Sequence, residues 1–144
     1  MKILAFILLA AFANIGWLGD FNAAKAQAAK EHKLILINFS GSDWCGPCIR
    51  LRKEILETPE FDQYATEHLV LVRADFPRQK KNQLDKAQVK RNEALADKYN
   101  ADGKFPYTLL VDENGRVLKE WDGFPNVSTA NFIAQIDPFI HAQH

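Results

Sequence analysis

The feature that most constrains the fold is a pair of cysteines at the junction between a strand and a helix. Cys45 and Cys48 are the only cysteines of the 144-residue chain and lie in the sequence Trp-Cys-Gly-Pro-Cys. A continuous apolar run, residues 34–39, precedes them and has the length and β-branched content of a buried strand. After them, Cys48, Leu51 and Ile55 recur with the spacing of one helix face. The pattern predicts that Cys45 lies at or near the N-terminus of a helix that follows a buried strand.

That position favours a reactive thiol at Cys45. Unpaired backbone N–H groups and the positive end of the helix dipole stabilise an anion there, so we expect the pKa of the Cys45 thiol to be lowered. Pro47 fits the first helical turn, where its missing N–H costs no hydrogen bond. Cys48, one turn further, is expected to face inward, where it can attack a mixed disulfide formed at Cys45. The pair therefore has the arrangement of a dithiol built for exchange.

Three other roles for the pair stay open on the residues alone. A zinc site needs about four ligands, and the available histidines are scattered along the chain: His32, His68, His141 and His144. A purely structural bridge between residues this close would remove little entropy from the unfolded chain. Copper carriage by the dithiol is the third role. The strand before the motif and the helix after it favour exchange over all three.

At these residues the chain resembles the thioredoxin family, whose signature Trp-Cys-Gly-Pro-Cys occupies residues 44–48. Residues 104–111 are similar to the family's cis-proline segment and the strand after it. Residues 39–45, residues 73–77 and the long insertion before Phe105 look like the periplasmic thioredoxin-like disulfide reductases of the DsbH type. Asn38 departs from the pattern, because thioredoxin carries a buried Asp on this strand that assists proton transfer at the second cysteine. One extra residue also separates Asn38 from the cysteines.

The resemblance covers roughly residues 15–140 and implies an α/β thioredoxin fold. This is a mixed central sheet with helices on both faces and one helical insertion before the cis-proline segment. The resemblance also implies the chemistry of the two cysteines. Cys45 is the expected nucleophile and Cys48 the resolving thiol, and their oxidation leaves the redox-active disulfide Cys45–Cys48.

The resemblance assigns supporting roles to the residues around the cysteines. Trp44 is expected to pack over the motif and limit its exposure, whereas Gly46 and Pro47 tune the potential of the dithiol. Phe105 and Pro106 are expected to hold the backbone extended beside the dithiol, where a substrate can pair with it as an added strand. No bound cofactor and no metal are expected.

The Gly-Pro dipeptide between the cysteines resembles the reducing members of the family, so we expect a protein-disulfide reductase. The expected partners are disulfide-containing proteins and a membrane protein that supplies electrons. A disulfide isomerase and a non-enzymatic, copper-binding dithiol protein are the alternatives. Because an isomerase usually needs a second subunit or domain and neither is evident, we expect a monomer.

The first 18 residues differ from the rest of the chain. Lys2 is followed by an apolar run, residues 3–13, too short to span a bilayer comfortably. Because Ala11-Phe12-Ala13 has the small-x-small pattern of a signal-peptidase site, we expect a signal peptide over residues 1–13 and a periplasmic thioredoxin-like domain over residues 14–144. A cut after Ala26 would destroy a predicted helix. A buried N-terminal helix and an uncleaved anchor are the alternatives.

The remaining sequence alternates predicted helices and strands. In order these are a helix over 21–30 capped by Asp20, the strand 34–39, a helix from Cys45 to about 57, a further turn capped by Thr58, a strand over 69–72, a helix over 82–99, strands 107–112 and 117–121 joined by an Asn-Gly turn, and a final helix capped by Ser128 that Pro138 kinks or ends. Trp17 is expected on a short edge strand.

Charge is distributed unevenly although the formal net charge is zero. Residues 78–104 carry eight basic and four acidic side chains, an excess of +4. A solvated helix flank and a docking surface for acidic partners both account for this excess. No aromatic residues are interleaved with the charges, so no nucleic-acid partner is expected.

Overall fold

A computed structural model describes residues 16–143 of the chain; the predicted signal peptide, residues 1–13, lies outside the described residues. One mixed sheet of four strands forms the centre, in the order β2-β1-β3-β4. The strands are β1 (Leu34–Ser40), β2 (Leu69–Asp75), β3 (Tyr107–Val111) and β4 (Val117–Asp122). β1 runs parallel to β2 and antiparallel to β3, and β4 is antiparallel to β3. The predicted mixed α/β thioredoxin fold is confirmed.

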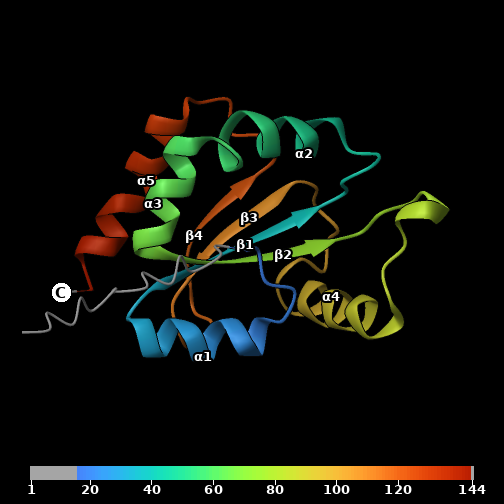
Figure 1. Cartoon of the computed structure of the whole chain (residues 1–144), viewed down its shortest axis with the longest axis horizontal. Helices are drawn as coiled ribbons and strands as arrows, with labels where there is room; N and C mark the ends of the chain where they lie inside the picture. The colour runs from blue at the N-terminus through green and yellow to red at the C-terminus, as the bar shows by residue number, and fades with distance from the viewer. Residues whose placement is uncertain (1–15, 144) are drawn as a thin grey trace, which may run out of the picture.

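Helices cover both faces of the sheet (Figure 1). One face carries α1 (Phe21–Glu31) and α4 (Lys86–Tyr99), and the other carries α2 (Gly46–Leu51), α3 (Pro59–His68) and α5 (Thr129–His141). All seven residues of β1 are buried because it is a central strand. Its side chains alternate between two cores: Leu34 and Leu36 pack in the layer of α2, α3 and α5, whereas Ile35, Ile37 and Phe39 pack in the layer of α1 and α4.

The predicted helix starts are confirmed by their capping geometry. Asp20, Thr58 and Ser128 each accept a backbone N–H from the first turn of α1, α3 and α5 with their side-chain oxygens. Gly115 of the predicted Asn-Gly turn has a φ of 83° at the tip of the β3–β4 hairpin, a conformation that glycine adopts without steric cost.

Other elements differ from the prediction. The helix that follows Cys45 changes after Leu51 into a single π-helical stretch, Arg52–Leu56. The helical insertion begins with a short 3₁₀ turn, Lys80–Asn82, and α4 itself starts only at Lys86, where Asp85 provides the cap.

Two predictions at the ends of the domain need correction. Of the two outcomes predicted for Pro138, a kink or the end of the helix, the second is wrong, because α5 continues to His141. His141 is therefore a helical residue, and its ring nitrogen lies 3.1 Å from the Asp137 carboxylate one turn earlier. At the other end Leu18, rather than Trp17, bridges the edge strand β2, at Val72.

Within residues 16–143, no helix has the length and apolar character needed to cross a bilayer.

Candidate active site

The two cysteines lie at the start of α2, just after the end of β1, as predicted. Cys45 is the N-cap of α2, and its Sγ accepts the backbone N–H of Cys48 at 3.2 Å. The two residues form a disulfide with Cα atoms 5.2 Å apart. Gly46 and Pro47, between them, are exposed, whereas Cys45 and Cys48 are only 6% and 3% exposed. The helix N-terminus thus directs a hydrogen-bond donor at Cys45, which favours a thiolate there once the disulfide is reduced.

Gly41 supports both cysteines, a role that the sequence did not assign. Its backbone N–H points to Cys48 Sγ at 3.4 Å, and its carbonyl accepts the N–H groups of Trp44 and Cys45. A Cβ at this position would lie 2.3 Å from a ring carbon of Trp44. Only glycine therefore lets the tryptophan pack against this turn, and the glycine itself was the one sequence signal available.

Trp44, which precedes Cys45 in the chain, belongs to an aromatic cluster. Its indole N–H donates to the Phe76 carbonyl at 2.7 Å, which ties it to the chain after β2. The rings of Trp44 and Phe105 lie 5.4 Å apart between centroids, and those of Phe76 and Phe105 lie 5.5 Å apart. Both pairs are edge-to-face, the arrangement that aromatic rings prefer. The predicted residues Trp44 and Phe105 are thus brought together, and Phe76 joins them.

The peptide bond between Phe105 and Pro106 is cis, as the resemblance implies. Pro106 is buried, and its carbonyl accepts the Gly123 N–H at 2.9 Å. Tyr107 then enters β3, where it pairs with Phe39 of β1. These contacts fix Phe105 beside the motif, so the structure gathers all the predicted site residues at one end of the sheet.

The loop before the cysteines is anchored by two carboxylates that sequence reasoning missed. Asp75, at the end of β2, accepts both the N–H and the hydroxyl of Ser42. Asp43 accepts the backbone N–H groups of Arg78 and Gln79, each at 2.9 Å, and the side-chain amide of Asn82 at 3.0 Å. The hydrogen bonds from Arg78 and Asn82 lower the pKa of the Asp43 carboxyl, because they favour its ionised form.

Asn38, the residue that departs from the thioredoxin pattern, is buried on the central strand β1. It shares the face of β1 with Leu34 and Leu36, which pack with α2, and it is 3% exposed. Its amide donates to the Thr108 hydroxyl at 3.1 Å, directly across the β1–β3 pair. The buried position is therefore polar and satisfied, and its side chain is an amide that does not titrate.

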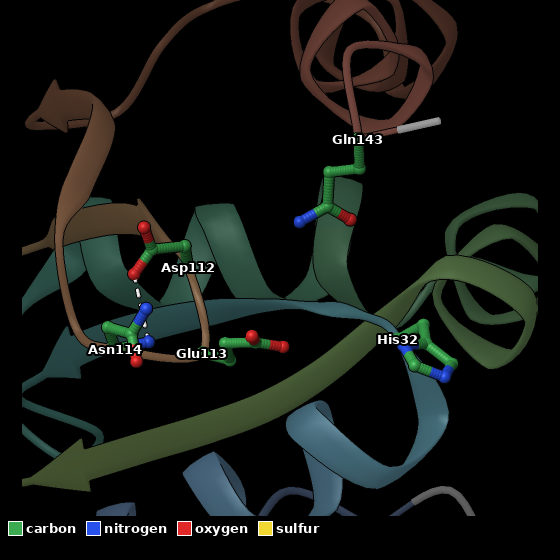
Figure 2. Close-up of a pocket in the computed structure, with 5 residues that line it drawn as sticks. All are labelled: His32, Asp112, Glu113, Asn114 and Gln143. Atoms are coloured by element: carbon green, nitrogen blue, oxygen red, sulfur yellow. Dashed lines mark hydrogen bonds between the residues drawn. The ribbon is translucent and has the colours of Figure 1, made fainter.

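One hollow of the surface lies away from the dithiol. It measures about 560 Å³ and is lined by His32, Asp112, Glu113, Asn114 and Gln143 (Figure 2). His32 precedes the first residue of β1 and the cysteines follow its last, so the length of the strand separates the hollow from the motif. Among residues 16–143, no group of three or more His, Cys, Asp or Glu side chains is placed to hold a metal ion.

The comparisons with known proteins agree with this site. Residues 21–138 match the family model described as "Thioredoxin-like domain". The "Disulfide bond reductase DsbH" of Chlamydia pneumoniae is 33% identical over 126 residues, which are 88% of this chain and 73% of the relative. The "Thioredoxin-related protein DsbJ" of the same organism is also 33% identical, over 82% of this chain but only 33% of its own length.

Among solved structures, one titled "DsbH Oxidoreductase" superposes with a TM-score of 0.78 at 30% identity, and the match covers 98% of this chain and 94% of the other. The protein therefore belongs to the thioredoxin-like family, as a member of the DsbH type.

Proposed function

We propose that the protein is a periplasmic reductase of protein disulfides that works through Cys45 and Cys48. The chain is a thiol–disulfide oxidoreductase; the proposal concerns the direction of exchange, the substrates and the compartment. The observation that carries it is the placement of Cys45 at the N-cap of α2 with Cys48 one turn behind it. The relative named a disulfide bond reductase and the Gly-Pro dipeptide support the reducing direction.

The reaction begins from the reduced dithiol. The Cys45 thiolate attacks one sulfur of the substrate disulfide, forms a mixed disulfide and releases the other substrate sulfur as a thiolate. Cys48 then loses its proton and attacks the Cys45 sulfur, which forms the Cys45–Cys48 disulfide and releases the second substrate thiolate. Two electrons pass from the protein to the substrate, and the two substrate thiolates take up the protons that the dithiol gave up.

The structure suggests what the other site residues contribute to this cycle. The Cys48 N–H stabilises the nucleophile, and the Gly41 N–H points to the sulfur that resolves the intermediate. Trp44 and Phe105 pack against each other next to the motif, and the backbone at Phe105 and Pro106 is the surface on which we place the substrate chain.

The oxidised protein has to be reduced again before each new cycle. We assign this step to a membrane protein that carries electrons across the inner membrane, because the periplasm is kept oxidising. We expect the reductase itself to be a monomer, with single-protomer mass in light scattering.

The proposed direction is tested by the reduction potential. We expect a potential below about −230 mV, on the side of thioredoxin rather than of the strong oxidant DsbA. A fluorescence titration of the protein against dithiothreitol or glutathione mixtures measures it, and the Cys45→Ser/Cys48→Ser double variant controls for changes in the buffer. A potential above about −180 mV would contradict the reductase and move the protein to the isomerase or oxidant class.

A second assay tests activity on protein substrates. With dithiothreitol as electron source, the wild type is expected to accelerate the reduction of insulin, which is followed by the turbidity of the released B chain. The double serine variant provides the uncatalysed rate. Equal rates for the two proteins would contradict disulfide reduction.

A further inference from the structure

The segment after β2 is fastened to the loop that carries the cysteines. Asp43 holds it through the N–H groups of Arg78 and Gln79 and the amide of Asn82, and the Trp44 indole holds it through the Phe76 carbonyl. The two segments are about 35 residues apart in sequence. Residues 76–82 therefore form one wall of the site rather than a free loop.

Arg78 lies on the face of the tryptophan that precedes the nucleophile. The Cζ atom of its guanidinium is 3.7 Å from the centre of the Trp44 ring, which is cation–π distance. Arg78 is exposed and, among the described residues, has no carboxylate within ion-pair distance. The nearby Asp43 carboxylate is already occupied by backbone and amide donors. The Arg78 guanidinium thus lies on the ring of the residue that precedes Cys45, and no described carboxylate forms an ion pair with it.

Two further positive charges lie close to Arg78 in the chain. Lys80 and Lys81 follow on the 3₁₀ turn, are exposed and likewise have no ion pair within residues 16–143. Two other cations in neighbouring elements are paired, Arg50 with Glu54 at 3.1 Å and Lys104 with Asp122 at 3.5 Å. The Asp75 carboxylate is occupied by Ser42. The neutral donors bound to Asp43 and Asp75 leave the negative charges of both carboxylates in place. With Arg78, Lys80 and Lys81 this edge of the site therefore carries three positive and two negative charges, an excess of one positive charge.

The basic residues at the end of α4 do not contribute to this edge. Lys98 lies over Tyr99, whose hydroxyl bonds to the Gly115 carbonyl at the tip of the β3–β4 hairpin. That hairpin lies at the start of β1, since Val111 pairs with Ile35, and so at the opposite end of the sheet from the dithiol. Arg78, Lys80 and Lys81 thus belong to the wall of the site, whereas Lys98 lies at the far end of α4.

We propose that Arg78 is a specificity-determining residue that selects substrates with an acidic side chain close to the disulfide. This inference rests on the proposed function, because it needs a substrate disulfide at Cys45. A carboxylate near the substrate cysteine would meet a guanidinium already immobilised on Trp44, which forms a directed ion pair at little cost in side-chain order. Lys80 and Lys81 extend the field and raise the encounter rate with acidic segments.

The test uses two synthetic peptides with the same intramolecular disulfide, flanked by glutamates in one and by lysines in the other. The reduced protein is mixed with each peptide, and its oxidation is followed by acid quenching and mass spectrometry. The wild type is expected to reduce the acidic peptide about five-fold faster, and the preference should shrink as salt rises from about 20 to about 300 mM.

Two substitutions of the same residue separate charge from structure. Arg78→Glu is expected to abolish or invert the preference, whereas Arg78→Lys should keep most of it. Asp43 binds the backbone of residue 78, so both variants retain that attachment. Lys98→Glu makes the same charge change at the far end of the sheet and should leave the preference at the wild-type value.

Each outcome bears on one of the two proposals. Equal rates with both peptides in the wild type, or a ratio that Arg78→Glu leaves unchanged, would overturn the role of Arg78 while the reductase stands. A shift in Lys98→Glu as large as in Arg78→Glu would also overturn it, because net charge alone would then explain the ratio. A wild type that reduces neither peptide would count against the reductase itself.

Discussion

At the scale of single residues, the two sulfur atoms of the motif have different surroundings. Cys45 Sγ sits at the open end of α2 and accepts the Cys48 N–H, whereas Cys48 lies within the first turn and faces Gly41. Cys45 is also slightly more exposed than Cys48, with exposed fractions of 6% and 3%. The different surroundings support the proposal that Cys45 is the sulfur that meets substrate and Cys48 the one that resolves the mixed disulfide.

Single cysteine variants test this division. Cys48→Ala should leave a working nucleophile without a resolving thiol, so mixed disulfides with substrate should accumulate. Cys45→Ala should capture little, because the remaining thiol is buried under the loop. Non-reducing gels after exposure to periplasmic extract, with and without dithiothreitol, provide the readout. Adducts that form equally with both variants, or only with Cys45→Ala, would reverse the assignment, and adducts with neither would favour a structural bridge or metal binding.

Asn38 offers a second test at a single residue. Asn38→Asp places a carboxyl in a buried position, where desolvation raises its pKa above the unfolded value of about 3.9. Above that pH the unfolded chain releases the proton and the folded chain keeps it, so stability falls as pH rises toward the folded pKa. We expect a loss of about 1–3 kcal/mol that is larger at pH 8 than at pH 5, and an additional inflection in the rate of disulfide reduction across pH 6–9.

The exposed Asn114→Asp, in the β3–β4 turn, is the matched control and should show neither effect. Urea unfolding at the two pH values and the rate profile provide the measurements. Equal pH dependence in both variants would mean that the side chain at position 38 does not titrate in a buried environment.

At the scale of elements, the Asp43 carboxylate is one of two side chains of the cysteine loop that hold residues 76–82, the other being the Trp44 indole. The pKa of Asp43 is lowered, so its stabilising contacts are complete above the unfolded value of 3.8 and are lost as pH falls through the lower folded pKa. The segment is expected to stay docked at neutral and mildly acidic pH. The Arg78 side chain faces the Trp44 ring and forms no ion pair with Asp43.

NMR titration of the Arg78 and Gln79 amide protons measures this release. Both resonances should shift together with a midpoint below 3.8, because both N–H groups donate to the same carboxylate. In Asp43→Ala the two amides should have lost this transition and exchange faster with solvent. A midpoint above 3.8 would contradict the proposed anchoring.

Thr58 links three helical elements, and we expect its replacement to cause a measurable loss of stability. Its hydroxyl accepts the Phe61 N–H, donates to the Ile55 carbonyl and lies 3.4 Å from the Thr129 hydroxyl. Thr58→Ala should reduce the free energy of unfolding by about 1–2 kcal/mol, since it removes the cap of α3. The exposed Thr66→Ala should change it by no more than about 0.5 kcal/mol. Urea unfolding of both variants measures the two free energies of unfolding. Equal losses in the two variants would show that the cap of α3 makes no specific contribution to stability.

The elements also show what local sequence can predict. Local sequence predicted the apolar run of β1, the caps of α1, α3 and α5 and the turn at Gly115, because each of these features depends on a few neighbouring residues. The cysteine pair was readable for the same reason. The helix across Pro138 was not, because packing of Phe132, Ile136 and Ile140 in the core holds α5 together beyond the break that a proline favours.

The part of the site that sequence patterns did not reveal depends on long-range contacts. Asp43 and Arg78 are 35 residues apart, and their link uses backbone N–H groups that leave no trace in residue type. The role of Gly41 likewise follows from the position of the Trp44 ring and not from spacing. The family resemblance predicted the cis peptide bond at Pro106, whereas the role of residues 76–82 as a wall of the site follows from the fold alone.

At the scale of the whole molecule, the compartment decides whether the chemistry is useful. In an oxidising periplasm a reducing dithiol needs its own electron supply, whereas in the cytosol it would join the general thiol pool. The position of α1 is compatible with removal of a signal peptide, since the helix begins at Phe21, seven residues after the proposed new N-terminus at Asn14. A cut after Ala26 would instead divide α1, whose buried residues Ala24 and Ala28 pack against the sheet.

We therefore expect that a bacterial host exports the full chain and removes residues 1–13. Mass spectrometry of the periplasmic fraction should find an N-terminus at Asn14, because Ala11 and Ala13 present the small side chains that signal peptidase accepts. Ala13→Pro is expected to block cleavage and leave the full-length chain with the membrane fraction, while Ala23→Pro, beyond the site, should still be cut. An N-terminus at Met1 in the soluble periplasmic protein, or at Gln27, would contradict the predicted signal peptide.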